Sequence, residues 1–126
     1  MSHNDDLILV IDDSKFSRWA IAKLLNAKGF NVIEAENGKE GLEKCRSQSI
    51  ALVLLDLLMP EMNGLEFIKN LKLEGIDIPI VVVSADIQQT SEERCRSMGV
   101  TKFLKKPIKE PELVSIVAGY IPRISG

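Results

Sequence analysis

The stretch from Ile50 to Gly64 (IALVLLDLLMPEMNG) constrains the fold more than any other part of the sequence. It begins with a run of apolar, partly β-branched residues that ends in one carboxylate, Asp56, and continues into a loop with a proline and an Asn-Gly pair. Apolar runs this dense are typical of strands buried on both faces, as in a parallel sheet. Ligands bind such sheets at the carboxyl ends of the strands, so we expect Asp56 to lie at a binding edge.

Length and composition fit one globular domain. The chain has 126 residues, of which 45% are hydrophobic and 27% are charged, and this is enough for one core of ordinary size. The formal net charge of -2 gives no basic field for nucleic acid. The apolar runs are too short to span a membrane, and the polar, acidic start argues against a signal peptide. We expect residues 1–126 to form one cytoplasmic domain with a frayed N-terminus over residues 1–6.

The cysteine and histidine content argues against disulfide and zinc chemistry. Cys45 and Cys95 are far apart in the sequence, and we expect both to be reduced thiols on buried helix faces. His3 is the only histidine and lies close to the N-terminus, where chains are poorly ordered. A histidine-based catalytic or zinc site is therefore not expected.

Apolar runs alternate with helical patterns five times along the chain. The predicted strands are Leu7–Ile11, Asn31–Ala35, Ile50–Asp56, Ile78–Ser84 and Val100–Leu104. The predicted helices are about Lys15–Lys28, Lys39–Ser47, Gly64–Leu73, Thr90–Met98 and Glu110–Tyr120. This alternation predicts an α/β fold with a parallel sheet and helices on both faces. The first, third and fourth strands are the most apolar and the second and fifth the most polar, which predicts the order 2-1-3-4-5.

Capping residues and apolar spacing support these predicted helices. Ser14 or Asp13 is positioned to cap the first helix and Asn63 the third, and Thr90 with Glu93 has the spacing of a capping box. The apolar residues of the first helix that we expect to face the core are Phe16, Trp19, Ala20, Leu24 and Ala27.

Five chemically active side chains follow the predicted strands. Asp12 and Asp13 follow the first strand, Asp56 and Ser84 end the third and fourth, and Lys106 lies just past the fifth. In the predicted order they converge on one edge of the sheet. Three carboxylates are hard oxygen ligands that suit Mg²⁺, or Mn²⁺. A metal and a lysine on either side of a carboxylate can neutralise a phosphoryl group during transfer, and a carboxylate can accept that group.

The sequence resembles the receiver domain of two-component response regulators, particularly the stand-alone, CheY-like type. The likeness spans essentially the whole chain and has the flavodoxin-like strand order 2-1-3-4-5. It rests on four elements in order: Asp12-Asp13, the DLLMPEMNG segment from Asp56 to Gly64, Ser84-Ala85, and Lys106-Pro107.

The resemblance implies a role for each acid. Asp56 is the phosphoacceptor for a histidine kinase. Asp12 and Asp13 hold Mg²⁺, Asp13 directly and Asp12 partly through water, together with Asp56 and the backbone carbonyl of Leu58.

The resemblance also implies a switch. Ser84 and Lys106 bind the phosphoryl group, and Phe103 takes the aromatic switch position on a partner-binding face formed by the fourth helix, fifth strand and fifth helix. Leu58 and Asp86 occupy positions that vary in the family and tune the lifetime of the phosphoryl group.

These implications describe a monomeric signalling switch rather than a turnover enzyme, with self-catalysed phosphorylation and dephosphorylation only. Its expected partners are a histidine kinase, a phosphatase and an output protein of unknown identity, with neither nucleic acid nor membrane. Motor control in chemotaxis, a phosphate sink and a relay intermediate are alternatives for its pathway.

Three other functions are alternatives to this one. A Mg²⁺-dependent aspartyl phosphatase of the haloacid-dehalogenase type carries a second acid two residues after the nucleophile, where this chain has Leu58. A receiver cut from a longer DNA-binding regulator is less favoured because no linker or helix-turn-helix pattern follows. A degenerate receiver is disfavoured because all reactive groups are present. The basic cluster Lys102, Lys105, Lys106 and Lys109 is either a solvated edge or part of the partner face.

Overall fold

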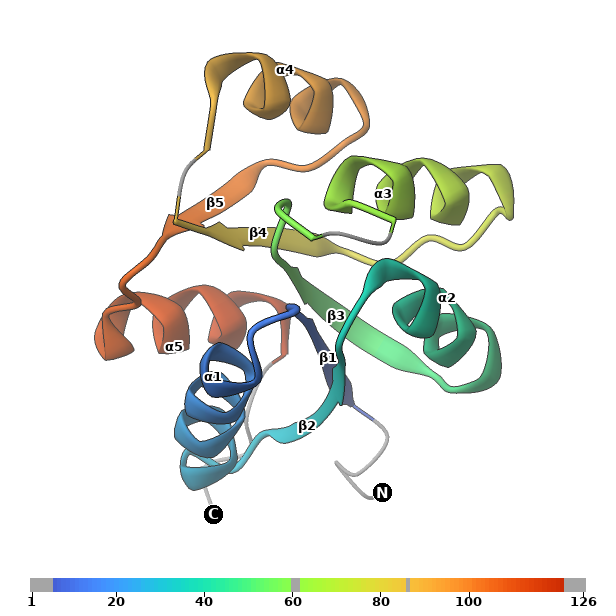
Figure 1. The fold of residues 1–126 in the computed structure, drawn as a ribbon. Helices are drawn as coiled ribbons and strands as arrows, with labels where there is room; N and C mark the ends of the chain where they lie inside the picture. The colour runs from blue at the N-terminus through green and yellow to red at the C-terminus, as the bar shows by residue number, and fades with distance from the viewer. Residues whose placement is uncertain (1–5, 60–61, 86, 122–126) are drawn as a thin grey trace.

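A computed structural model describes residues 6–59, 62–85 and 87–121, and these contain five strands that alternate with five helices (Figure 1). The strands are β1 (Leu7–Ile11), β2 (Asn31–Ala35), β3 (Ile50–Leu55), β4 (Ile80–Ser84) and β5 (Lys102–Lys105). The helices are α1 (Lys15–Ala27), α2 (Gly38–Ser47), α3 (Gly64–Leu73), α4 (Gln89–Ser97) and α5 (Glu110–Tyr120). The strands are parallel in the order β2-β1-β3-β4-β5, so the predicted fold class and strand order are confirmed.

Helices cover both faces of the sheet (Figure 1). On one face, Ile21 and Leu25 of α1 and Leu113 of α5 pack with inward residues of the strands such as Val10 and Leu54. α2, α3 and α4 cover the other face. Because successive side chains of a strand point to opposite faces, the central strands β1, β3 and β4 are buried almost throughout.

Two predicted helix caps are present. The Ser14 hydroxyl caps α1 by accepting from the Ser17 amide. Asn63 caps α3 in a capping box, in which its side chain accepts from the Glu66 amide and the Glu66 carboxylate accepts from the Asn63 amide. These bonds satisfy amide groups that have no partner inside the helix.

The predicted capping box of α4 is wrong. The helix begins one residue before Thr90, and its N-cap, Gln88, makes no side-chain capping bond. Glu93 instead accepts from the Gln89 side chain one turn earlier, at 3.2 Å. Of the nine residues of α4, all of which the structure describes, Cys95 alone is buried.

The predicted core-facing side of α1 is wrong in part, because Leu24 packs against the core but other residues of the predicted stripe do not face it. The side chains that α1 buries are Ile21, Ala22 and Leu25. Of the predicted stripe, Phe16, Trp19 and Ala27 are exposed, and Ala20 and Leu24 are half-buried. Two apolar stripes run along this helix, and its spacing alone does not show which one the β1–α1 turn directs at the sheet.

Two strands begin later than predicted. β4 begins at Ile80 rather than Ile78, and β5 begins at Lys102 rather than Val100. The amide of Val100 donates to the carbonyl of Cys95 in the turn that ends α4, so this amide is engaged before β5 begins.

Cys45 and Cys95 are free and buried, as predicted. No helix among the described residues is long and apolar enough to cross a membrane. His3, residues 1–5 of the predicted frayed terminus, Pro60 of the loop after Asp56, and Asp86 lie outside the described residues.

Candidate functional site

The neighbouring strands β1 and β3 bring two acids together. Ile11 pairs with Leu55 in the parallel register, so Asp12 and Asp56 follow at the same level of the sheet. The amide of Asp56 donates to the carbonyl of Ile11 at 3.0 Å. Both acids are buried, with Asp12 2% and Asp56 7% exposed. The predicted convergence of these two acids is therefore present.

Both carboxylate oxygens of Asp56 have partners. Oδ1 accepts from the Ser84 hydroxyl at 2.8 Å and from the Leu58 amide at 3.0 Å. Oδ2 accepts from the Lys106 ammonium at 3.3 Å. Ser84 is fully buried at the end of β4. The side chain of Asp56 is thus held between a hydroxyl donor and a cation.

Lys106 connects the two acids. Its amide donates to the carbonyl of Ser84, and its Nζ lies 2.5 Å from Oδ2 of Asp12 and 3.3 Å from the Ser17 hydroxyl. Burial by itself lowers the pKa of Lys106, but the hydrogen bond and charge of Asp12, followed by those of Asp56, raise the pKa above its ordinary value. Lys106 therefore stays a cation at neutral pH.

For the pKa of Asp12, the effect of burial outweighs that of the hydrogen bonds. Burial has the largest effect and raises the pKa of Asp12, while the hydrogen bonds from Lys106 and the Ser14 amide lower it in part. The charge of Asp56 raises this pKa further, and the net result lies above the ordinary value. Because burial disfavours the charged carboxylate, a second cation beside Asp12 would stabilise it.

Three acids form a donor set for a metal ion. Asp12, Asp13 and Asp56 each offer a carboxylate oxygen, and these atoms all lie within 4.8 Å of one another. Asp13 is exposed at the mouth of the site, so water can complete the coordination. All-oxygen ligands with water fit Mg²⁺ or Mn²⁺. The side chain of Leu58 is 58% exposed, and the role of its carbonyl as a ligand stays a prediction.

Gly64 contributes to the site in a way that the sequence pattern does not predict. A Cβ atom there would lie 2.8 Å from Cα of Leu57 and 3.0 Å from the carbonyl oxygen of Asp56. These contacts involve backbone that cannot shift without moving Asp56. Glycine therefore allows the first turn of α3 to pack directly against the end of β3.

Phe103 lies on β5, where it pairs with Val82 of β4 and packs against the core on the face covered by α2, α3 and α4. The guanidinium carbon of Arg96, on α4, lies 4.8 Å from the centre of the Phe103 ring. The predicted switch position thus contacts α4 rather than the acid cluster.

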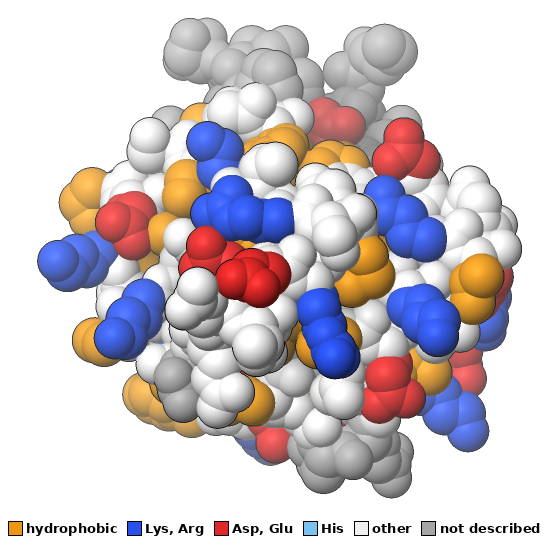
Figure 2. Space-filling model, turned by 90° about the horizontal axis from the view of Figure 1, so that it is seen from above, with side chains coloured by type: hydrophobic (Ala, Val, Ile, Leu, Met, Phe, Trp, Pro, Cys, Tyr) orange, Lys and Arg blue, Asp and Glu red, His pale blue; other side chains and the backbone are white. Residues whose placement is uncertain are grey.

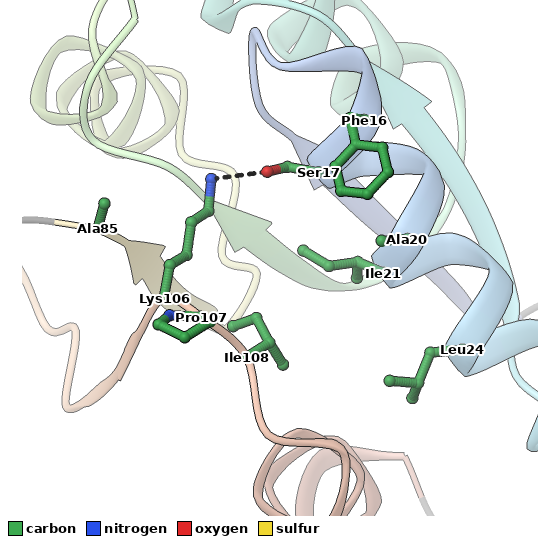
Figure 3. A pocket seen from close by; sticks show the side chains of 9 residues that line it. All are labelled: Phe16, Ser17, Ala20, Ile21, Leu24, Ala85, Lys106, Pro107 and Ile108. Carbon is green, nitrogen blue, oxygen red and sulfur yellow. Dashed lines mark hydrogen bonds between the residues drawn. The ribbon is translucent and has the colours of Figure 1, made fainter.

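An apolar groove adjoins the site (Figure 3). It has a volume of about 510 Å³ and lies between α1 and the segment that follows β5. Ser17 and Lys106, joined by a hydrogen bond, lie at one end. The other lining residues are Phe16, Ala20, Ile21, Leu24, Ala85, Pro107 and Ile108. The groove was not predicted, because Phe16 was expected to face the core and is exposed instead.

The aromatic side chains beside this groove extend the apolar surface. Phe16 is 75% exposed, and its ring centre lies 6.0 Å from that of Trp19. Lys23 lies over the Trp19 ring at 4.8 Å. Figure 2 shows a face of the molecule with acidic side chains near its middle and Lys and Arg side chains around them.

Comparisons with known proteins agree with this geometry. The sequence profile of the response regulator receiver domain matches residues 8–118. The polar-differentiation response regulator DivK of Brucella anthropi is 30% identical over 116 residues, which cover 90% of this chain and 94% of that protein. The CAI-1 autoinducer sensor kinase/phosphatase CqsS of Vibrio cholerae is 34% identical over 123 residues, but these are 18% of that longer protein. The structure of the Vibrio cholerae chemotaxis protein CheY4 is similar with a TM-score of 0.85 and 25% identity, over 91% of this chain and 98% of that one.

Proposed function

Since this chain belongs to the response regulator receiver domain family, we propose that it accepts a phosphoryl group on Asp56 from a histidine kinase and thereby changes its binding to a partner. One observation carries this proposal. The buried carboxylate of Asp56 is held between the Ser84 hydroxyl and the Lys106 ammonium, beside two further acids. That arrangement suits a fixed nucleophile with charge stabilisation on both sides.

Asp12, Asp13 and Asp56, with the carbonyl of Leu58, are the residues that would hold Mg²⁺ or Mn²⁺. When bound, this ion supplies positive charge for the phosphoryl oxygens. Lys106 Nζ lies 2.5 Å from Asp12 and 3.3 Å from Asp56. With positive charge from the ion beside Asp12, Lys106 would be available to donate to a phosphoryl oxygen.

The transfer step uses Asp56 as the nucleophile. A carboxylate oxygen attacks the phosphorus of a phosphohistidine, the phosphorus–nitrogen bond breaks, and the imidazole leaves with the electron pair. Ser84 and Lys106 then donate to the phosphoryl oxygens instead of to the carboxylate. The chain catalyses its own phosphorylation and slow dephosphorylation and does not turn over a separate substrate.

In this proposal the donor approaches Asp56 past the exposed end of α1. Phe16 and Trp19 present aromatic surface there, next to the apolar groove that ends at Lys106. Exposed apolar surface beside a functional centre is typical of a protein–protein contact. We assign this face to the kinase.

The response passes through β4 and β5 to α4. A shift of Ser84 toward the phosphoryl group moves the loop after β4, and the surface formed by α4, β5 and α5 changes shape, with Phe103 as the switch residue. A segment held by few buried contacts needs little free energy to move, and α4 is anchored by Cys95. The two free thiols suit a reducing compartment such as the cytoplasm.

The test is phosphorylation of the purified protein with Mg²⁺ and a small acyl-phosphate donor, followed by intact mass. Wild type gains one phosphoryl group, and Asp56→Asn gains none. Asp77→Asn removes an exposed acid before β4 and serves as the matched control. Equal uptake by wild type and Asp56→Asn would overturn the proposal.

A further inference from the structure

Arg18 connects α1 to the acid cluster without touching a carboxylate of the cluster. Its side chain is 12% exposed. Its NH1 donates to the backbone carbonyl of Asp12 at 2.6 Å, and its Nε donates to Glu34 at 3.3 Å. Glu34 lies on β2, directly beside β1. Arg18 thus joins three elements at the point where β1 ends.

With the bond from Arg18, every polar group of Asp12 has a hydrogen-bond partner. The Asp12 amide donates to the carbonyl of Ala35 at 3.2 Å. Its carboxylate accepts from the Ser14 amide at 2.9 Å and from Lys106. The carbonyl of Asp12 is the remaining polar group, and Arg18 holds it. Arg18 therefore fixes the direction of the peptide group between Asp12 and Asp13, from which both side chains extend.

The charge of Arg18 argues against a purely electrostatic role. A cation close to three clustered acids would compete with a metal ion for their charge. The charge is engaged by Glu34, and the directed bond goes to a carbonyl. A planar guanidinium presents its donors in a rigid fork and so fixes the direction of both bonds, whereas an ammonium is a compact charge on a flexible stem.

We propose that Arg18 is a positioning residue for divalent-cation binding, which orients the Asp12–Asp13 turn through the carbonyl of Asp12 and is itself anchored by Glu34. This inference rests on the proposed function, because it presumes that the three acids bind Mg²⁺. Residues that hydrogen-bond to metal ligands without touching the metal typically contribute about 10-fold or more to metal affinity.

Calorimetric titration with Mg²⁺ alone tests the proposal, with the folded state of each variant verified by its unfolding transition. Arg18→Ala is expected to raise the Kd for Mg²⁺ about 10-fold or more. Arg18→Lys keeps the charge but loses the two-partner geometry, so it restores only part of the affinity. Glu34→Gln keeps the arginine and weakens its anchor, so its loss is smaller than that of Arg18→Ala.

The matched control is Arg46→Ala. Arg46 also pairs with a glutamate, Glu74, through two bonds of 2.6 Å, but it links α2 to the end of α3. This variant loses an arginine–glutamate pair yet should bind Mg²⁺ like wild type.

The direction of the change in Mg²⁺ affinity shows whether Arg18 acts by its position or only by its charge. If Arg18 acted only as a charge, its removal would tighten Mg²⁺ binding, and tighter or unchanged binding by Arg18→Ala overturns the positioning role. An equal loss in Arg46→Ala overturns it as well, because the effect would then be general. If wild type itself binds no Mg²⁺, the proposed function fails and this inference fails with it, whereas Mg²⁺ binding by wild type that is unchanged in Arg18→Ala overturns this inference alone.

Discussion

α1 and α4 both follow strand ends that carry site residues, but the protein attaches them in different ways. α1 follows Asp13, is capped by Ser14, and buries three apolar side chains. Arg18 ties it to the end of β1. Its exposed aromatic residues are therefore not needed to hold the helix in place, which leaves them free to contact a partner.

α4 follows the segment after Ser84 and has the opposite character. Its described residues are mostly polar, its N-cap makes no side-chain bond, and Cys95 is the one side chain that it buries. The stacking of Arg96 on Phe103 adds a contact at the surface. The difference indicates that α1 is a fixed platform and that α4 is the helix with the smaller cost of movement.

The largest expected difference concerns the free energy of unfolding. Leu25→Ala in α1 deletes a fully buried side chain and should cost about 2–5 kcal/mol. Cys95→Ala in α4 removes one buried sulfur atom and should cost about 1 kcal/mol. Urea denaturation of both variants measures this, and equal losses would contradict the comparison.

A second expected difference concerns local opening. Amide hydrogen exchange in α4 should proceed through an opening that is at least about 1.4 kcal/mol less costly than global unfolding, or about 10-fold faster. Exchange of the interior amides of α1 should follow global unfolding. If the slowest amides of the two helices exchange alike, α4 is no looser than α1.

The proposed docking role of α1 predicts slower phosphotransfer from the kinase without a loss of stability. Phe16→Ser combined with Trp19→Gln should slow phosphotransfer from the kinase about 10-fold, equivalent to about 1.4 kcal/mol. The free energy of unfolding should change by no more than about 0.5 kcal/mol per site, because both side chains are exposed.

Two controls separate docking from chemistry in that experiment. Uptake from a small acyl phosphate should be unchanged in the double variant, because no docking face is needed. Leu73→Ser removes a 73% exposed apolar side chain from the end of α3 and should leave the kinase reaction unaffected. Slow uptake from both donors would place Phe16 and Trp19 in the chemistry instead.

The last expected effect, which vanishes at neutral pH, is a pH dependence that arises in α4. Burial, followed by the charge of Glu92, raises the pKa of the Cys95 thiol from its ordinary value of 9.0 to about 11. The unfolded thiol loses its proton first, so stability should fall as the pH rises between these two values and be unaffected by this group below them. Cys95→Ala should show a shallower fall in urea denaturation. Parallel slopes in the two proteins would mean that α4 opens enough for the thiol to titrate normally.

Much of the site was predictable because it depends on connectivity. Once five apolar strands alternate with helices, right-handed parallel connections place every strand end on one edge. The contacts of Asp56 with Ser84 and Lys106 follow from that rule and from the greater polarity of the second and fifth strands. The capping box at Asn63 was predictable for a similar reason, because its partners are three residues apart.

Other features were not predictable from the sequence. They depend on how a helix is rotated about its axis and on distances between segments that are remote in the chain. Apolar spacing permits α1 to face the sheet with either of two stripes, and the turn after Asp12 selects the one that contains Leu25. The same rotation exposes Phe16 and turns Arg18 toward the carbonyl of Asp12.

The sequence by itself therefore determined the sheet, its order and the set of groups that meet at its edge, since these follow from local pattern and chain direction. Only the tertiary structure decided how those groups are held. The close approach of Gly64 to the end of β3 and the bond of Arg18 to Asp12 depend on distances of a few ångströms between packed elements. Residue spacing along the chain does not encode such distances.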